Sequence, residues 1–254
     1  MSSLRFLAPA LLALAFGAAP AASAQTFSDS QRGEIEQIVK RYLLAHPEVL
    51  EDVSAELSKR QAAAETLKHE AAVTENTDAI FNSPRGVTLG NKNGDVTFVE
   101  FFDYNCGYCK RAMIDMLELL KSDHKLKIVL KEFPVLGQNS VEAAQVAVAA
   151  RMQDPTGKKY LDFHQKLLGN RGQADKARAL AAAKEAGFDI AKIEKDMTST
   201  EVRATLEENF KLAESMGMNG TPSYVIGKQV IVGAVGLENL KEKINTARCG
   251  KVAC

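Results

Sequence analysis

Residues 96–110 constrain the fold more than any other part of the chain. They join a β-branched and aromatic run, residues 96–102, to a Cys-x-x-Cys motif formed by Cys106 and Cys109. Helical spacing of apolar residues follows at Ala112, Met113, Met116, Leu117 and Leu120. The pattern predicts a buried strand that leads into a helix, with the first cysteine at the start of that helix.

The position of the motif favours redox chemistry. A thiol in the first turn of a helix faces unpaired backbone N–H groups and the positive end of the helix dipole, and both stabilise its thiolate. We therefore predict that Cys106 is the nucleophile and that Cys109, one turn further on, is the resolving thiol. Zinc sites use the same spacing, but His124 and His164 do not stand at ligand-like spacing. A redox dithiol is thus favoured over a metal site and over a merely structural disulfide, and no cofactor is expected.

The chain begins with the pattern of a secretory signal peptide. Arg5 precedes an apolar run at residues 11–16, and Ala22, Ser23 and Ala24 offer the small residues of a cleavage site. The run is short for a membrane span. We expect residues 1–24 to be removed and the rest to be exported to the periplasm. Acidic and basic residues are equal in number, 32 each, so the composition gives no reason to expect nucleic-acid binding.

Export bears on the other cysteines. The chain has four cysteines, and they form two close pairs, which favours two short loops over the other connectivities. Both pairs can be oxidised outside the cytosol. We expect Cys249 and Cys254 to form a structural disulfide that staples the C-terminal tail. A second redox or metal site at this pair is the alternative.

Residues 25–84 are predicted to form an N-terminal helical arm. Between Gly33 and the end of this segment the chain has no glycine, and Pro47 predicts a kink or a new first turn. Apolar residues recur every three or four positions, beginning with Ile35, Ile38 and Val39. Such a stripe covers either its own domain or the same arm of another subunit, and the length of the arm favours self-association.

The remainder predicts a βαβ unit, a block of helices and a ββα unit. A second strand, residues 126–134, follows the helix after Cys109 and should pair in parallel with the first strand. Residues 140–216 are helical in pattern. Two short strands and a helix from Leu237 end the chain. Residues 85–139 and 217–254 are therefore expected to form the catalytic domain, with residues 140–216 as an inserted helical domain.

Three further residues strengthen the redox interpretation. Pro222, between Thr221 and a strand, is a candidate cis-proline that would expose the Thr221 backbone to an extended substrate; a trans-proline at a strand start is the alternative. Strand alternation places Glu100 among apolar side chains beneath the dithiol, where it can relay the proton of Cys109. A solvated glutamate is the alternative there. Lys131 on the next strand is a candidate partner of Glu100; a lysine on an exposed strand face is the commoner alternative.

Residues 101–109, together with Gly220, Thr221 and Pro222, resemble the DsbA-like branch of the thioredoxin superfamily, over about residues 85–248. The resemblance implies an α/β thioredoxin fold with an inserted helical domain. It also implies that Cys106 forms the mixed disulfide with substrate, that Cys109 resolves it, and that Pro222 is cis.

Two departures modify this expectation. DsbA-type oxidases commonly carry Pro-His between the cysteines and valine before the cis-proline, whereas Gly107, Tyr108 and Thr221 resemble DsbC-type isomerases. The helical arm resembles that of ScsC-like oligomeric members, some of them trimeric. The resemblance thus implies a periplasmic disulfide isomerase, with Thr221, Pro222, Gly107 and Tyr108 contacting substrate.

The expected partners are unfolded or misoxidised exported proteins, a membrane reductase or oxidase as redox partner, and further copies of the chain. A DsbA-type oxidase is the alternative with the same chemistry. A periplasmic copper- or zinc-binding protein that uses the two thiols of the motif is the alternative of another class.

Overall fold

The computed structural model describes residues 27–254, so the predicted signal peptide lies outside the described residues. The chain divides into two units, residues 1–57 and 58–254, and each is described by itself. Within the described residues, no helix combines the length and the apolar character needed to cross a membrane.

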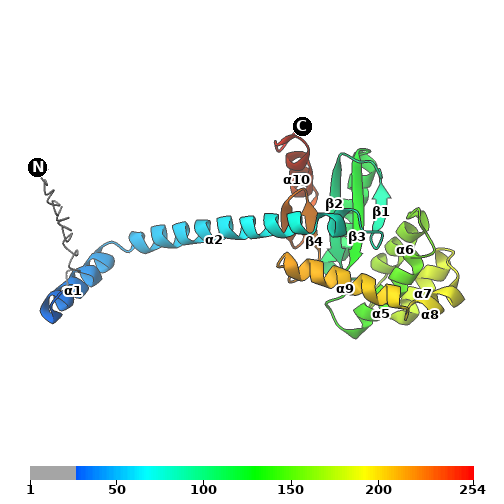
Figure 1. Cartoon of the computed structure of the whole chain (residues 1–254), viewed down its shortest axis with the longest axis horizontal. Helices are drawn as coiled ribbons and strands as arrows, with labels where there is room; N and C mark the ends of the chain where they lie inside the picture. The colour runs from blue at the N-terminus through cyan, green and yellow to red at the C-terminus, as the bar shows by residue number, and fades with distance from the viewer. Residues whose placement is uncertain (1–26) are drawn as a thin grey trace, which may run out of the picture. The chain divides into compact units, whose positions relative to one another are not determined.

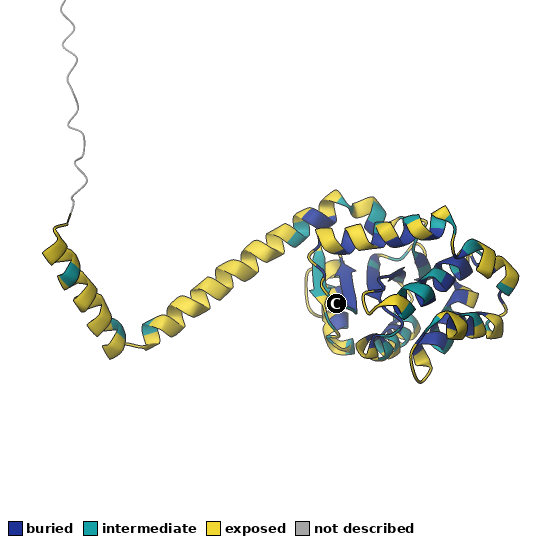
Figure 2. Cartoon of the chain, turned by 90° about the horizontal axis from the view of Figure 1, so that it is seen from below, coloured by how far each residue is buried: buried dark blue, intermediate teal, exposed yellow. Residues whose placement is uncertain are grey.

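Two helices form the predicted arm. Helix α1 (Asp29–Ala45) begins with a capping box in which Ser28 and Gln31 exchange side-chain hydrogen bonds with backbone N–H groups. Helix α2 (Glu48–Glu75) starts just after Pro47, as the sequence predicts. No residue of α1 is buried, and Ile38, Val39 and Tyr42 are 56%, 50% and 53% exposed. Figure 2 shows this exposure along both helices.

A five-stranded sheet organises the second unit. Its strands are β1 (Val87–Gly90), β2 (Val96–Phe102), β3 (Leu126–Glu132), β4 (Ser223–Ile226) and β5 (Gln229–Val232), in the order β1-β3-β2-β4-β5 (Figure 1). Strands β2 and β3 are parallel and are connected by α4 (Gly107–Ser122), while the other neighbours are antiparallel. With α10 (Leu237–Cys249) after β5, this is the predicted thioredoxin fold.

Strand β2 is buried on both faces, which explains its nearly continuous apolar sequence. Phe98 and Phe102 face a core formed with α4 and α10, where Ala112, Met116, Leu240 and Ile244 pack. Val99 and Phe101 face the opposite core, which contains Ala72 and Val73 of α2, Ile80 of α3 (Thr77–Phe81), and Leu212 and Met216. The alternation along β2 therefore decides which side chains lie on the dithiol side of the sheet.

Five helices lie between β3 and β4, as expected for a helical insertion (Figure 1). They are α5 (Gln138–Arg151), α6 (Lys158–Gly169), α7 (Lys176–Glu185), α8 (Ile190–Asp196) and α9 (Thr200–Ser215). The pattern from Ile190 to Met216 predicts one helical run, but the structure breaks it into α8 and α9. The break occurs because Ser199 accepts a hydrogen bond from Val202 N and so caps a new helix.

Candidate active site

The dithiol lies where β2 passes into α4. Strand β2 ends at Phe102, and Cys106 occupies the N-cap position of α4 with an extended backbone. The backbone N–H of Cys106 donates to the oxygen of Asp103 at 3.1 Å, and its own carbonyl accepts from Lys110 N at 3.2 Å. The thiol at this N-cap therefore faces the unpaired N–H groups of the first helical turn.

The two cysteines are free thiols with unequal environments. Cys106 is 6% exposed and Cys109 is fully buried. A hydrogen bond from Cys109, with further bonds from Thr221 and from the backbone N–H groups of Cys109 and Tyr108, lowers the pKa of Cys106 to about 5, against an opposing effect of burial. Burial, followed by Cys106 and Glu100, raises the pKa of Cys109. At neutral pH the geometry gives one thiolate at Cys106 and one thiol at Cys109.

The proline loop lies against this thiolate. The Thr221–Pro222 peptide bond is cis, as predicted, and Cys106 Sγ lies 3.1 Å from the backbone oxygen of Thr221, to which the protonated thiol donates. Ser223 Oγ donates to the carbonyl of Gly220 at 2.7 Å and closes the loop. The backbone of Thr221 thus lies beside the reactive sulfur.

The residues between the cysteines form the outer surface of the site. Tyr108 is 60% exposed, and the guanidinium of Arg111 lies 5.4 Å from the centre of its ring. A β-carbon added at Gly107 would meet no atom within 4 Å. Both positions therefore border open space.

Glu100 lies on the dithiol side of β2, opposite Leu130 on β3 and Tyr224 on β4. It is 3% exposed, so the solvated alternative is wrong. Burial, and then the charges of Asp115 and Cys106, raise its pKa to about 8. Its charge in turn contributes to the raised pKa of Cys109. A carboxyl in this position can hold a proton at neutral pH close to the resolving thiol.

Lys131 is not the partner of Glu100. It stands opposite Phe101 in the β2–β3 register, so its side chain points to the other face of the sheet. Its Nζ atom lies 3.6 Å from Glu208 Oε1 on α9 and is fully buried. The alternative of an exposed lysine is also wrong, because Lys131 is 0% exposed. The parallel register puts Glu100 and Lys131 on opposite faces of the sheet.

Two polar residues before Cys106 fix the loop, and the sequence analysis did not single them out. Asp103 accepts from the backbone N–H of Asn105 at 2.8 Å, and from those of Val135 and Leu136 at 2.9 and 3.0 Å. Asn105 exchanges two hydrogen bonds with the backbone of Ala174, at 2.7 and 2.9 Å. Their position directly before the cysteine was a signal, but nothing in the sequence connects residue 105 with residue 174.

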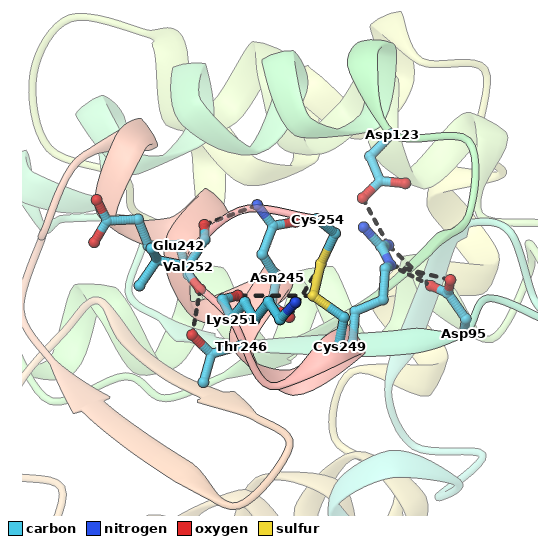
Figure 3. Close-up of a disulfide and its surroundings, with 10 residues drawn as sticks. Asp95, Asp123, Glu242, Asn245, Thr246, Cys249, Lys251, Val252 and Cys254 are labelled. Carbon is cyan, nitrogen blue, oxygen red and sulfur yellow. Dashed lines mark hydrogen bonds and ion pairs between the residues drawn. A yellow bond between two sulfur atoms is a disulfide. The ribbon is translucent and has the colours of Figure 1, made fainter.

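Cys249 and Cys254 form the predicted disulfide (Figure 3). It joins the last residue of α10 to the end of the chain, and Asn245 Nδ2 donates to the Val252 carbonyl within the same turn. The neighbouring Arg248 binds Asp95 and Asp123, both at 2.8 Å. Asp95 directly precedes β2, whereas Cys106 follows its far end, so this disulfide and the dithiol lie about 20 Å apart along the strand.

No group of three or more His, Cys, Asp or Glu side chains that could hold a metal ion occurs among residues 27–254. Met216 and Met218, which lie near the proline loop in sequence, are buried in the core behind the sheet. The donors available to a soft metal beside the proline loop are therefore the two thiols.

Two family models match the chain. Residues 97–245 match the DSBA-like thioredoxin domain, and residues 31–64 match the N-terminal domain of the copper resistance protein ScsC. The first match covers β2 to β5, the dithiol and the helical insertion, but not β1, and the second covers most of α1 and the first part of α2.

Solved structures and curated proteins agree with the family models. A thioredoxin-like oxidoreductase from Silicibacter pomeroyi DSS-3 is 42% identical with a TM-score of 0.64, over 67% of this chain and 96% of that one. Proteus mirabilis ScsC in a transitional conformation is 26% identical with a TM-score of 0.64, over 88% and 98%. Disulfide bond formation protein D of Bacillus subtilis is 25% identical, over 64% and 77%.

The chain also matches the Na(+)/H(+) antiporter NhaA 1 of Salinispora arenicola, at 24% identity over 63% of this chain. It spans 24% of the length of that protein.

Proposed function

The chain belongs to the DSBA-like thioredoxin domain family, and on this premise we propose that it is an exported thiol–disulfide oxidoreductase that acts as a protein disulfide isomerase. The observation that carries the proposal is the pair of departures at the dithiol: Gly107 and Tyr108 between the cysteines, and Thr221 before the cis-proline. These positions border the reactive sulfur of Cys106 in the structure.

The reaction begins with attack of the Cys106 thiolate on one sulfur of a wrong substrate disulfide. A bond forms between Cys106 and that sulfur, and the other substrate sulfur leaves as a thiolate. Attack by a substrate thiolate on the mixed disulfide then forms a new substrate disulfide and releases Cys106. The substrate's disulfides are rearranged with no net oxidation or reduction.

Cys109 resolves a mixed disulfide that no substrate thiolate has attacked. In the mixed disulfide Cys106 has lost the charge that helps to raise the pKa of Glu100, so an ionised Glu100 is the proposed acceptor of the Cys109 proton. The Cys109 thiolate then attacks the sulfur of Cys106 and releases the substrate thiol. The enzyme is left with a Cys106–Cys109 disulfide, and the substrate disulfide has been reduced. A reductase partner must then return two electrons to the enzyme. The raised pKa of Cys109 makes its attack slower than the first attack.

The thiolate at Cys106 is stabilised chiefly by neutral groups: the thiol of Cys109, Thr221, and two backbone N–H groups. A histidine between the cysteines would add a cation beside the sulfur, and Tyr108 does not. Because a more stable thiolate makes the disulfide more oxidising, this arrangement favours shuffling over strong oxidation.

Refolding of scrambled ribonuclease tests the direction of the chemistry. The reduced protein is expected to recover ribonuclease activity, whereas Cys106→Ala is not. The Cys106–Cys109 disulfide of the natural chain is expected to be less oxidising, in equilibrium with glutathione, than that of a DsbA-type oxidase measured in parallel. A strongly oxidising equilibrium together with no recovery of scrambled ribonuclease would show a DsbA-type oxidase instead.

Self-association through the arm is part of the proposal. The apolar residues of α1 and the start of α2 are exposed, including Leu50, Val53 and Leu57 at 54–59%. An apolar stripe of this length is removed from water when the same stripe of another copy packs against it, and this burial favours association. Several arms joined in this way, a trimer among the forms considered, would bring several dithiols to one substrate protein.

Solution mass measurements test the arm. Ile38→Glu combined with Tyr42→Glu is expected to give monomers, because it places charges on the exposed apolar stripe. Ser30→Glu combined with Gln37→Glu adds the same charge to other exposed positions of α1 and serves as the control. Equal masses for the two variants and the natural chain would remove the arm from the proposal.

Copper binding is the second candidate, and one comparison favours it: residues 31–64 match a domain described as belonging to a copper resistance protein. Cys106 and Cys109 are free and offer two soft sulfur ligands. Titration with copper(I) should then show tight binding that Cys106→Ser abolishes. Equal binding by the natural chain and this variant would exclude the dithiol as the copper site.

A further inference from the structure

Tyr104 connects the dithiol loop to the helical insertion. It stands two residues before Cys106 and is 2% exposed. Its hydroxyl lies 3.1 Å from that of Tyr160 and 3.3 Å from Nδ1 of His164, both on α6. Its ring makes an edge contact with Phe102 at 5.0 Å. A loop that carries the nucleophile is therefore anchored by side chains about 60 residues away along the chain.

The chain of hydrogen bonds continues to a buried carboxyl. The hydroxyl of Tyr160 donates to Glu132 Oε1 at 2.5 Å, at the end of β3. Glu132 is 1% exposed, and its other oxygen has no hydrogen-bond partner among the described residues. Burial raises the pKa of Glu132, and the hydrogen bond from Tyr160 and the charges of Arg151 and Lys131 oppose that shift. Four buried groups thus form one line from Glu132 through Tyr160 and Tyr104 to His164.

The proton count gives this line a direction. Because Tyr160 uses its proton on Glu132, its oxygen can only accept, so the Tyr104 hydroxyl must donate to it. The oxygen of Tyr104 then accepts from Nδ1–H of His164. Burial lowers the pKa of His164 to about 3, so its ring is neutral and carries one proton. The contact with Tyr104 is a hydrogen bond in this chain only if that proton lies on Nδ1. Each step is determined by the previous one, starting from the hydrogen bond that Tyr160 donates to Glu132.

We propose that Glu132, Tyr160 and His164 are positioning residues that hold Tyr104, and through it the Cys106 loop, by a hydrogen-bond chain of fixed direction. Fixing Tyr104 keeps the start of α4 in place, so that the backbone N–H groups of Tyr108 and Cys109 remain directed at the Cys106 sulfur. The insertion thereby acts on the pKa of the Cys106 thiol through Tyr104. This inference rests on the proposed role of Cys106 as nucleophile, but not on the choice between isomerase and oxidase.

Nitrogen NMR of the histidine rings tests the direction of the chain. In the natural chain the His164 proton is expected on Nδ1. Tyr160→Phe removes the acceptor of Tyr104, whose hydroxyl then donates to His164, so the proton is expected to move to Nε2. A natural chain with the proton on Nε2, or a variant that keeps it on Nδ1, would overturn the proposal. The first result needs no variant, so it stands even if the substitution prevents folding.

Titration of the Cys106 thiolate tests the positioning role. In Tyr160→Phe the pKa of Cys106 is expected to rise by about half a unit, because the N–H groups of the first turn are less well held. Phe188→Leu is the control: it removes a ring contact with Phe163 in the same insertion, and within residues 27–254 Phe188 makes no ring contact or hydrogen bond with any of the four groups. The same Cys106 pKa in both variants would show that Tyr160 contributes only packing, and would overturn the proposal.

Isomerase assays separate this inference from the proposed function. If scrambled ribonuclease is not refolded, but the tautomer and the thiolate shift as expected, the isomerase proposal fails and the positioning network stands. If refolding occurs with neither shift, the network fails and the isomerase proposal stands.

Discussion

The thiols of Cys106 and Cys109 share a hydrogen bond that acts on them in opposite directions. It is the largest contribution that lowers the pKa of Cys106 to about 5, and it adds to the burial that raises the pKa of Cys109. One hydrogen bond thus distinguishes the nucleophile, Cys106, from the resolving thiol, Cys109. The order of events in thiol–disulfide exchange follows from this asymmetry.

Removing Cys109 should therefore raise the pKa of Cys106. In Cys109→Ala we expect a rise of about one unit or more, since a hydrogen bond to a charged group contributes about 1.5–3 kcal/mol. The ultraviolet absorbance of the thiolate across pH 3–9 measures it. Cys109→Ser keeps a donor at the same place and should shift less. Identical titrations in the two variants would show that the bond does not stabilise the thiolate.

The hydroxyl of Thr221 should contribute to the same thiolate. A side-chain hydrogen bond from Thr221 lowers the pKa of Cys106, so Thr221→Val, which has nearly the same shape, is expected to raise it by roughly one unit. Thr221→Ser retains the hydroxyl and provides the matched control. The prediction fails if alkylation of Cys106 has the same pH dependence in the valine and serine variants.

Stability of the reduced protein should depend on Cys106 in a defined pH range. Its folded pKa, about 5, lies below the ordinary value of 9.0, so the thiolate contributes stability that is fully present above pH 9. This contribution is lost as the pH falls through 5. The free energy of unfolding, measured with urea at a series of pH values, should therefore rise more steeply between pH 5 and 9 for the reduced natural chain than for Cys106→Ala. Parallel curves would contradict the lowered pKa.

Glu100 should have the opposite effect. Its folded pKa, about 8, lies above the ordinary value of 4.5. The natural chain is therefore expected to lose stability as the pH rises from about 4.5 through about 8, on the order of a few kcal/mol. Glu100→Gln should remove that loss and be the more stable protein at pH 9.

The same variant should also slow the resolving step. With no carboxyl to accept the proton of Cys109, Glu100→Gln is expected to accumulate the mixed disulfide with a model peptide, while the first attack keeps its rate. Glu118→Gln, an exposed change on α4, is the control for loss of one charge. Resolution at the natural rate in Glu100→Gln would remove Glu100 from the mechanism.

The C-terminal disulfide should stabilise the fold without taking part in catalysis. Cys249→Ser combined with Cys254→Ser is expected to cost roughly 2 kcal/mol of unfolding free energy, the value for so short a loop. Exchange kinetics at Cys106 should not change, because strand β2 separates the two sites. A changed rate of peptide reduction would identify this pair as a second redox centre.

The sequence determined the parts of this structure that depend on local pattern. The run before Cys106 predicted β2, the helical spacing after it predicted α4, and Pro47 marked the break between α1 and α2. The two close cysteine pairs also predicted which residues form the structural disulfide. Each of these features depends on neighbours within about one helical turn or one strand.

Features that depend on register and on distant contacts could not be predicted in the same way. The sequence leaves Lys131 either exposed or beside Glu100, but the β2–β3 register turns it toward α9, where it is buried. The contacts of Asn105 with Ala174 and of Tyr104 with Tyr160 join segments that only the insertion brings together. A single sequence contains no signal for such pairs, because their approach is decided by how five helices pack.

Helix α9 belongs by sequence to the insertion, yet Leu212 and Ala213 in its second half, and Met216 at its C-cap, are part of the core behind the sheet. Residues 140–216 are therefore not an independent unit that can be exchanged as a whole between relatives. A chimaera cut at residues 140 and 216 would strip one face of the sheet of its covering layer. Grafts that end before Ser199 would leave this layer in place, so the transferable module is α5–α8.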